Sequence, residues 1–277
     1  MRLSVANHKG GAGKSTVTGC LAEALAARGC RVLCVDLDPQ ANLSRRLGYG
    51  GDALAGLVTL SEVIKADEFG CAAQAITACR WPLPLAAAID LIPSRFDLEN
   101  RILEAGQPGA HLRLARGLAG VTDTYDVVLL DCPPSLGHLV QLGFAASDAV
   151  LVPVRPEYDY VAGATRVREF LTEHARHLAL PPGQLRRPRP RPRPGLAIAG
   201  LMINEQDRRR GLHTWHCDSL IELFGDRVWQ PSIPSRSALA EAIDAGEPLR
   251  SRPGPAVRDL VSIFDELADR VEKLHAA

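Results

Sequence analysis

A glycine-rich segment near the start of the chain limits the possible folds more than any other feature. Residues 8–16 read HKGGAGKST, and they lie between a short apolar run, Leu3 to Ala6, and an apolar helical stretch from about Thr16 to Arg28. Backbone amides of such a loop approach phosphate oxygens, and the N-terminus of the following helix adds a partial positive charge. The GKST ending in a strand–loop–helix context is specific, so the segment predicts a phosphate-binding loop (P-loop).

Apolar runs and helical stretches alternate along most of the chain. Beyond Leu3 to Ala6, four runs read as strands, at residues 31–35, 127–130, 149–153 and 196–203. Continuous apolar strands separated by helices are typical of a parallel sheet that is covered on both faces. The expected fold class is therefore α/β, a mostly parallel twisted sheet flanked by helices on both faces, in a single P-loop domain over residues 1–277.

Two regions interrupt this alternation. Residues 48–90 hold glycine-rich turns, and we expect short helices there, over one edge of the sheet. Residues 181–195 read PPGQLRRPRPRPRPG, and alternating proline favours an extended loop, so we expect a flexible Arg/Pro-rich insert. Lys plus Arg and Asp plus Glu each number 32, so a neutral chain still contains an arginine-rich sector. The insert is either a solvated segment with incidental charge or part of a surface that binds phosphates.

Several classes of protein are excluded by composition. No apolar run reaches the ~18 residues of a spanning helix, and the chain enters the P-loop too early for a signal peptide, so we expect a cytoplasmic protein. Seven scattered cysteines without a CxxC pair indicate reduced thiols. His213, His216 and Cys217 lack a second ligand pair, so we interpret them as a mixed helix surface and not as a metal site.

Charged side chains follow the predicted strands at the end where ligands collect in parallel sheets. Asp36 and Asp38 come after residues 31–35, and Asp131 comes after residues 127–130. In a P-loop, Lys14 would reach the β- and γ-phosphates and the Ser15 hydroxyl would ligate Mg²⁺. Asp36 and Asp38 could instead cap a helix, but two acids that face a P-loop make this the weaker interpretation.

Six motifs in the same order resemble one family of ATPases. They are KGGAGKS (9–15), VDLDPQANLS (35–44), VVLLDCPPSLG (127–137), VLVPVRPEYDYVAG (150–163), GLMINEQDRRRGL (200–212) and IPSRSALAEAIDAGEP (233–248). The first has histidine where the ordinary P-loop has its first glycine, and it adds a lysine at position 9. This pattern resembles the deviant Walker A of the ParA/MinD family, and the chain looks most like the ParA/Soj-type chromosome and plasmid partition ATPases.

The resemblance implies ATP and Mg²⁺ as cofactors and gives each site residue a role. Lys9 would be the signature lysine that reaches the phosphates of the partner in a sandwich dimer, and Asp38 would position the attacking water. Asp36 would support the Mg²⁺ shell and Asp131 would hold Mg²⁺ through water. Asn204 would read adenine, and the loop around Pro234 would flank the base. The expected catalytic residues are Lys9, Lys14 and Asp38; the expected metal-site residues are Ser15, Asp36 and Asp131; the expected ATP-binding residues are Lys9, Gly10, Gly11, Ala12, Gly13, Lys14, Ser15, Thr16, Asn204 and Pro234.

The activity implied by the resemblance is a weak ATPase that depends on dimerisation. An ATP-bound homodimer would bind nonspecific double-stranded DNA on the nucleoid, and a ParB-type centromere-binding partner would stimulate hydrolysis and release. Arg209 aligns with an arginine of the family's DNA surface, and Arg210 and Arg236 are the other expected DNA-binding residues. Arg236 falls close to a second DNA-contact position, but Ala238 occupies the matched position itself.

Two related functions remain open. A membrane-cycling ATPase of MinD type would need a basic amphipathic tail. The amphipathic tail 257–277 carries five acids, so we expect it to pack on the domain and expect no membrane partner; they are Asp259, Asp265, Glu266, Asp269 and Glu272. Positioning of a cargo other than DNA is the second alternative. A metabolic ligase or kinase would not need Lys9, and an iron–sulfur relative would need cysteine pairs.

Overall fold

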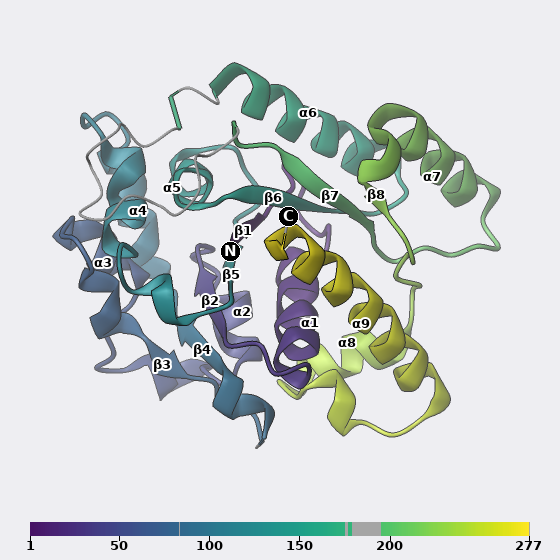
Figure 1. Ribbon diagram of the computed structural model, residues 1–277, viewed down its shortest axis with the longest axis horizontal. Coiled ribbons are helices and arrows are strands. Elements are labelled where there is room, and N and C mark those ends of the chain that lie inside the picture. Colours follow the sequence, from purple (N-terminus) through teal and green to yellow (C-terminus); the bar gives the residue numbers. More distant parts are fainter. Residues whose placement is uncertain (83, 175–176, 179–194, 277) are drawn as a thin grey trace.

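The computed structural model describes residues 1–82, 84–174, 177–178 and 195–276 (Figure 1). The Arg/Pro-rich insert expected at 181–195 lies, apart from Gly195, outside the described residues. The strands are β1 (Arg2–Val5), β2 (Val32–Asp36), β3 (Thr77–Ala78), β4 (Ile89–Ile92), β5 (Val127–Asp131), β6 (Ala149–Val154), β7 (Ile198–Ile203) and β8 (Val228–Trp229). The α-helices are α1 (Lys14–Ala27), α2 (Asn42–Arg46), α3 (Leu60–Ala66), α4 (Arg113–Gly117), α5 (His138–Ala146), α6 (Tyr158–His174), α7 (Gly211–Phe224), α8 (Ser237–Asp244) and α9 (Pro255–Ala276).

Short 3-10 helices join these elements. They are Gly51–Leu54, Cys71–Ala75, Leu85–Ala88, Phe96–Glu104, Ala110–Leu112, Thr122–Thr124, Gly225–Arg227 and Leu249–Ser251. The first three of them and α3 lie within or beside residues 48–90, where the sequence predicted short helices.

All eight strands form one sheet in the order β3-β4-β2-β5-β1-β6-β7-β8. Every neighbouring pair is parallel except the edge pair β3–β4, which is antiparallel. Because β1 lies between β5 and β6, the loop after β1 opens at the middle of the sheet. The predicted mostly parallel sheet is confirmed.

Alternate side chains of the central strands enter two different cores. Leu3 and Val5 of β1 and Leu129 of β5 face the layer that contains α1, α8 and α9. Val128 and Leu130 of β5 face the opposite layer, where α3, α4 and α5 pack, and the strands β6 and β7 are covered there by α5, α6 and α7. The sheet is therefore covered on both faces, as its uninterrupted apolar strands predict.

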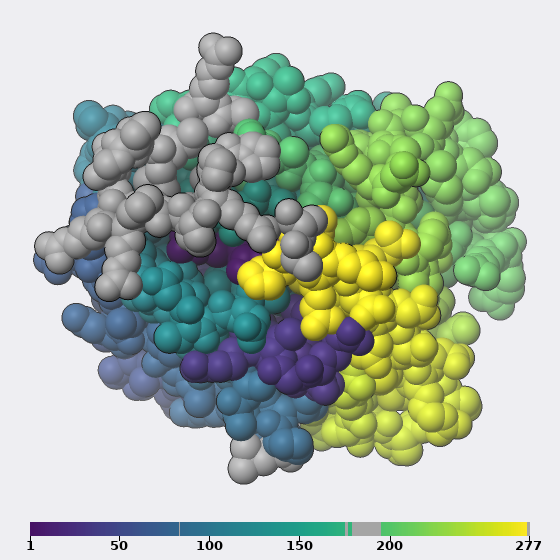
Figure 2. All heavy atoms as spheres, viewed as in Figure 1, coloured from purple at the N-terminus to yellow at the C-terminus, as the bar shows by residue number. Residues whose placement is uncertain are grey.

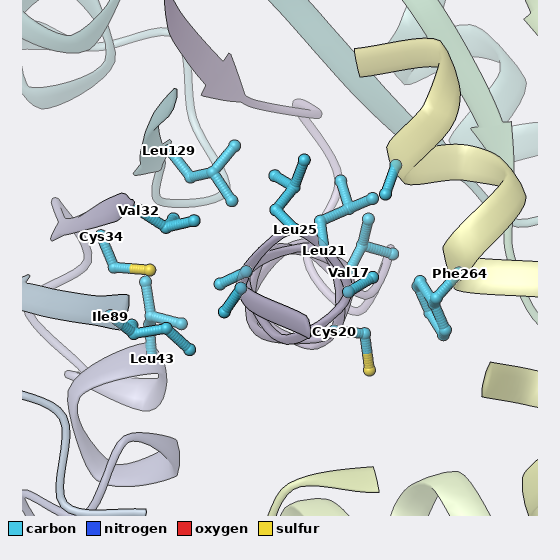
Figure 3. Close-up of a cluster of buried hydrophobic side chains, with 14 of the residues drawn as sticks. Val17, Cys20, Leu21, Leu25, Val32, Cys34, Leu43, Ile89, Leu129 and Phe264 are labelled. Atoms are coloured by element: carbon cyan, nitrogen blue, oxygen red, sulfur yellow. The ribbon is translucent and has the colours of Figure 1, made fainter. Parts of the chain in front are cut away.

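The C-terminal helix α9 packs against α1. Phe264 lies in the same apolar cluster as Val17, Leu21 and Leu25 of α1, and Figure 3 shows these side chains around α1, between the sheet and α9. Arg28, just after α1, adds ion pairs to Asp269 and Glu272 at the far end of α9. The yellow C-terminal segment lies beside purple N-terminal atoms in Figure 2. The prediction that the tail packs on the domain is confirmed.

The sequence missed three strands and misread one cluster. β3, β4 and β8 have two, four and two residues, too short for a periodic signal, and β4 follows an alanine-rich stretch. His213, His216 and Cys217 are buried, so the interpretation as a helix surface was wrong. Cys217 packs in the apolar cluster that contains Ile203 of β7 and Val228 of β8, and His213 Nδ1 accepts a hydrogen bond at 3.1 Å from the amide of Asp207, in the loop between β7 and α7. Within the described part of the chain, no group of three or more His, Cys, Asp or Glu residues is arranged to hold a metal ion.

A helix that spans a bilayer must be both long and apolar. Across the described ranges, which leave out residues 83, 175–176, 179–194 and 277, none is both long enough and apolar enough to span a membrane.

Candidate nucleotide-binding site

The loop between β1 and α1 has a backbone that requires glycine. Gly11 and Gly13 adopt φ of 78° and 84°, which L side chains rarely adopt. A Cβ at Gly13 would also overlap the side-chain amide of Asn204. Gly13 is the N-cap of α1, and the first turn of α1 carries no acidic side chain. The helix N-terminus is therefore left for an external anion, as a P-loop requires.

Lys14 lies inside the site. Its side chain is buried, and Nζ donates to the carbonyl oxygen of Lys9 at 3.4 Å. Burial lowers the pKa of the Lys14 ammonium, while the nearby charges of Asp131 and Asp38 act in the opposite direction. A lysine in this position is a cation that can neutralise the phosphate charge that would enter the loop.

Asp131 combines burial with an unpaired oxygen. The register of β2 and β5 places it opposite Asp36 at the ends of the two strands. Its Oδ1 accepts a hydrogen bond from Thr18 Oγ1 at 3.3 Å, and within the described part of the chain its buried Oδ2 has no partner. Burial raises the pKa of Asp131 to about 8, and the charge of Asp36 adds to this shift, while a hydrogen bond from Ser15 opposes it.

The pairing of Ser15 with Asp131 fits a magnesium site. Mg²⁺ prefers oxygen ligands, keeps several waters and needs few protein groups. A hydroxyl at the start of α1 and a neighbouring carboxylate with a free oxygen would supply such groups. Ser15 and Asp131 were both predicted from the sequence as residues of the magnesium site.

Asp36 holds the segment that carries Asp38. Its Oδ1 accepts the amide of Asp38 at 3.1 Å, and its Oδ2 accepts the amide and the hydroxyl of Ser44 at 2.8 and 2.7 Å. Burial raises the pKa of Asp36 to about 6, and the bonds from Ser44 oppose the shift. These three donors occupy both oxygens of Asp36, so the geometry favours a support for the Asp38 turn over direct contact with a metal.

Asp38 lies at the base of the same turn and is 7% exposed. Its Oδ1 accepts the Gln40 amide at 2.9 Å, so the turn fixes the direction of the carboxylate. The charges of Asp38 and Asp131 both act to raise the pKa of Lys14, against the effect of burial. Ser44 was not singled out from the sequence, although it ends the VDLDPQANLS motif.

Asn204 and Pro234 lie near the carboxyl end of β7. Asn204 Nδ2 donates to the Ala12 carbonyl at 3.1 Å, and its buried Oδ1 has no partner among the described residues. Gln206 forms a β-bridge with Pro234, and the Gln206 amide donates to Ile233 at 3.0 Å. The structure therefore brings both predicted base-contacting positions to the same end of β7, and it places Asn204 in contact with the P-loop.

Lys9 points in a different direction from Lys14. Its Nζ lies 2.8 Å from Asp159 Oδ2 on the first turn of α6, at the surface. Asp159 and its neighbours Tyr160 and Gly163 were not singled out as site residues. Their signal was their place in the motif VLVPVRPEYDYVAG.

The arginines expected at a DNA surface are exposed. The side chain of Arg209 is 91% exposed, and its Nε lies 3.0 Å from Asp207, whose pKa falls to about 2 because of this pairing. Arg210 is also exposed and lies 3.9 Å from Asp207, and Arg236 is exposed at the N-cap of α8. A hydrogen bond links the loop before Arg209 and Arg210 to the loop before Arg236: the Ser235 amide donates to the Gln206 carbonyl at 3.1 Å.

Comparisons with known proteins agree with this geometry. The family model described as AAA domain matches residues 1–179. Chromosome partitioning protein ParA of Caulobacter vibrioides is 34% identical over 250 residues, which cover 89% of this chain and 85% of that protein. The match to the family model includes the motifs up to residue 163, and the match to ParA covers most of the chain.

Two solved structures share the fold. McdA of Cyanothece superposes with a TM-score of 0.80 at 22% identity, over 98% of this chain and 98% of that chain. Cobyrinic acid a,c-diamide synthase of Mycobacterium smegmatis, with bound ADP and magnesium, gives a TM-score of 0.75 at 26% identity, over 98% of this chain and 94% of that chain.

Proposed function

This chain belongs to the ParA/MinD family of P-loop ATPases, and from that premise we propose that it is a partition ATPase whose ATP-bound dimer binds nonspecific DNA. The observation that carries the proposal is the 34% identity to ParA of Caulobacter vibrioides over 89% of the chain. A ParB-type partner stimulates hydrolysis in this proposal, and the dimer then releases DNA. The protein works on the nucleoid, as the ParA/Soj resemblance implies.

ATP and Mg²⁺ are the proposed ligands of the loop. The glycine conformations, the open N-terminus of α1 and the buried ammonium of Lys14 support binding of a triphosphate. Asn204 supports adenine, because its free Oδ1 is an acceptor for an amino group. Ser15 and Asp131 hold Mg²⁺, which neutralises charge on the phosphates when bound.

The remaining steps belong to side chains of this chain. Asp38 orients the attacking water, and the bonds that Asp36 accepts keep the Asp38 turn in place. Lys9 reaches the phosphates of the second subunit, which makes hydrolysis depend on dimerisation. Phosphoryl transfer needs little more than positioning and charge neutralisation, and these side chains are of the types that provide both.

DNA binding is the test of the proposed function. We expect the chain to bind random duplex DNA with ATP and not with ADP. Replacing Arg209 with alanine removes one phosphate contact from each subunit, so affinity should fall uniformly across sequences and the slope of log K against log salt should decrease by about 0.9 per subunit, or about 1.8 for the dimer. Fluorescence anisotropy at several salt concentrations measures both quantities.

Arg80 provides a matched control for Arg209. It is an exposed arginine beside β3, at the opposite edge of the sheet from β7 and β8. Arg80→Ala should therefore leave the slope unchanged. An unchanged slope for Arg209→Ala would remove Arg209 from the DNA surface. Binding of the ATP-loaded chain to anionic liposomes and not to DNA would favour the MinD-like alternative, and binding to neither would contradict the proposed DNA-bound dimer.

A further inference from the structure

The two lysines of the P-loop motif have different environments. Lys14 is buried in the site, whereas the side chain of Lys9 is 46% exposed. The Lys9 ammonium donates a hydrogen bond of 2.8 Å to Asp159, whose side chain is 61% exposed. The side chain proposed to act on a second subunit is therefore paired within its own subunit.

The start of α6 is packed closely enough on the loop to make this pair. A Cβ at Gly163 would overlap Asn7 Oδ1 and would lie 3.5 Å from the Lys9 amide, so only glycine permits the approach. On the same helix, the Tyr160 hydroxyl lies 3.1 Å from the position that a Cβ of Gly11 would occupy. The loop and the first turns of α6 thus form one packed unit with Lys9 and Asp159 at its surface.

The charges around the pair favour its formation. Asp159 lies in the first turn of a 17-residue helix, where the helix dipole stabilises a carboxylate. The hydrogen bond to Asp159 and then the charge of Asp159 raise the pKa of Lys9, while Arg166 has a smaller opposing effect. The same bond lowers the pKa of Asp159.

We propose that Asp159 is a positioning residue that restrains Lys9 on its own subunit, so that the ion pair must open before Lys9 can reach the nucleotide of a second subunit. This inference rests on the proposed ATP-dependent dimer. Asp159 is then an autoinhibitory element: it stabilises the monomer and raises the protein or ATP concentration at which the dimer forms.

The size of the effect follows from exposure and symmetry. Exposed ion pairs change an equilibrium by at most about fivefold. A symmetric dimer would have to open two such pairs, so the restraint should weaken dimerisation by up to about 25-fold. Because salt screens exposed charges, the effect should become smaller as the salt concentration rises.

The first experiment measures the pair without nucleotide. The chain has four lysines, Lys9, Lys14, Lys65 and Lys273, so reductive ¹³C-methylation gives few NMR signals, and Lys9→Arg assigns one of them. Asp159→Asn should lower the pKa of the Lys9 signal. Glu157→Gln is the control, since this neighbouring acid pairs with Arg155 at 3.4 Å. An unchanged Lys9 pKa in Asp159→Asn would overturn the proposal.

The second experiment measures dimerisation with Mg²⁺ and the nonhydrolysable analogue AMPPNP by sedimentation velocity. Asp159→Asn should dimerise up to about 25-fold more tightly at low salt, Asp159→Glu should return to the wild-type value, and Glu157→Gln should not differ from it.

The outcomes separate the two hypotheses. If the wild type dimerises and Asp159→Asn dimerises equally or less tightly, the restraint is wrong and the proposed function stands. If the wild type remains monomeric with AMPPNP, the proposed dimer is contradicted and the restraint with it, although the NMR titration would still record the ion pair.

Discussion

Replacing Lys14 with alanine is expected to abolish productive ATP binding and to leave a monomer that ignores DNA. Lys14 is a buried cation near Asp131 and Asp38, at the start of the helix that would receive the phosphates. Removing one partner of a buried, hydrogen-bonded charge pair costs ~2–5 kcal/mol, which corresponds to a loss in affinity of about 30-fold to several thousand-fold. No other step of the proposed cycle can proceed without this contact.

Calorimetric titration with Mg²⁺ and ATP measures the loss, and sedimentation with saturating ATP measures the oligomeric state. Lys65→Ala is the matched control, because Lys65 is an exposed lysine on α3. Thermal unfolding of both variants without nucleotide shows whether the fold is intact. A Lys14→Ala chain that still dimerises with ATP would contradict the role assigned to Lys14.

The parts of the fold that the sequence predicted are those with a strong local signal. β2, β5, β6 and β7 are almost entirely apolar and β1 is a short buried run, and a parallel sheet covered on both faces is the arrangement that buries such strands. β3 and β8 have only two residues each, so their pairing depends on neighbouring strands and not on their own pattern. The start of α1 was placed at Thr16 and lies at Lys14, because the left-handed conformation of Gly13 leads directly into the helix.

The motifs predicted which residues form the candidate site, but not how these residues are held in place. Residue types and order indicated that Lys14, Ser15, Asp38 and Asp131 would gather at the carboxyl ends of the strands. The hydrogen bonds that hold these side chains, such as those from Thr18 to Asp131 and from the Gln40 amide to Asp38, could not be predicted, because they depend on backbone geometry. Asp36 was expected to support the shell of the metal, and the bonds that its oxygens accept from Ser44 and from the Asp38 amide were not predictable from the sequence.

The contact between Lys9 and Asp159 illustrates the same limit. These residues are 150 positions apart, and they meet because Gly163 allows α6 to approach the P-loop. The family pattern gave Lys9 a role in a dimer but contained no information on where its side chain lies in a single subunit.

Asp38→Ala is expected to slow ATP turnover by about 100-fold or more while nucleotide binding is retained. The carboxylate is nearly buried and its direction is fixed by the Gln40 amide, so its loss removes a positioned group. Lys14, Ser15 and Asp131 do not depend on it for their place in the fold, so they should still bind Mg²⁺ and ATP. The ATP-bound dimer should therefore persist on DNA. Asp52→Ala is the control, because Asp52 is an exposed acid.

Lys9→Ala separates the interface from the chemical step. Since Lys9 lies outside its own site and is paired with Asp159, its removal should leave ATP binding to the single subunit intact. The sandwich dimer should form poorly, and turnover should fall because the dimer is missing. Size exclusion with ATP and steady-state turnover therefore distinguish the two variants: Asp38→Ala yields a stable dimer without turnover, and Lys9→Ala yields a monomer without turnover.

A Lys9→Ala chain that dimerises and hydrolyses ATP normally would exclude the cross-subunit mechanism. Wild-type turnover in Asp38→Ala would move the catalytic acid to Asp36, which would then have to release the bonds from Ser44 in order to act.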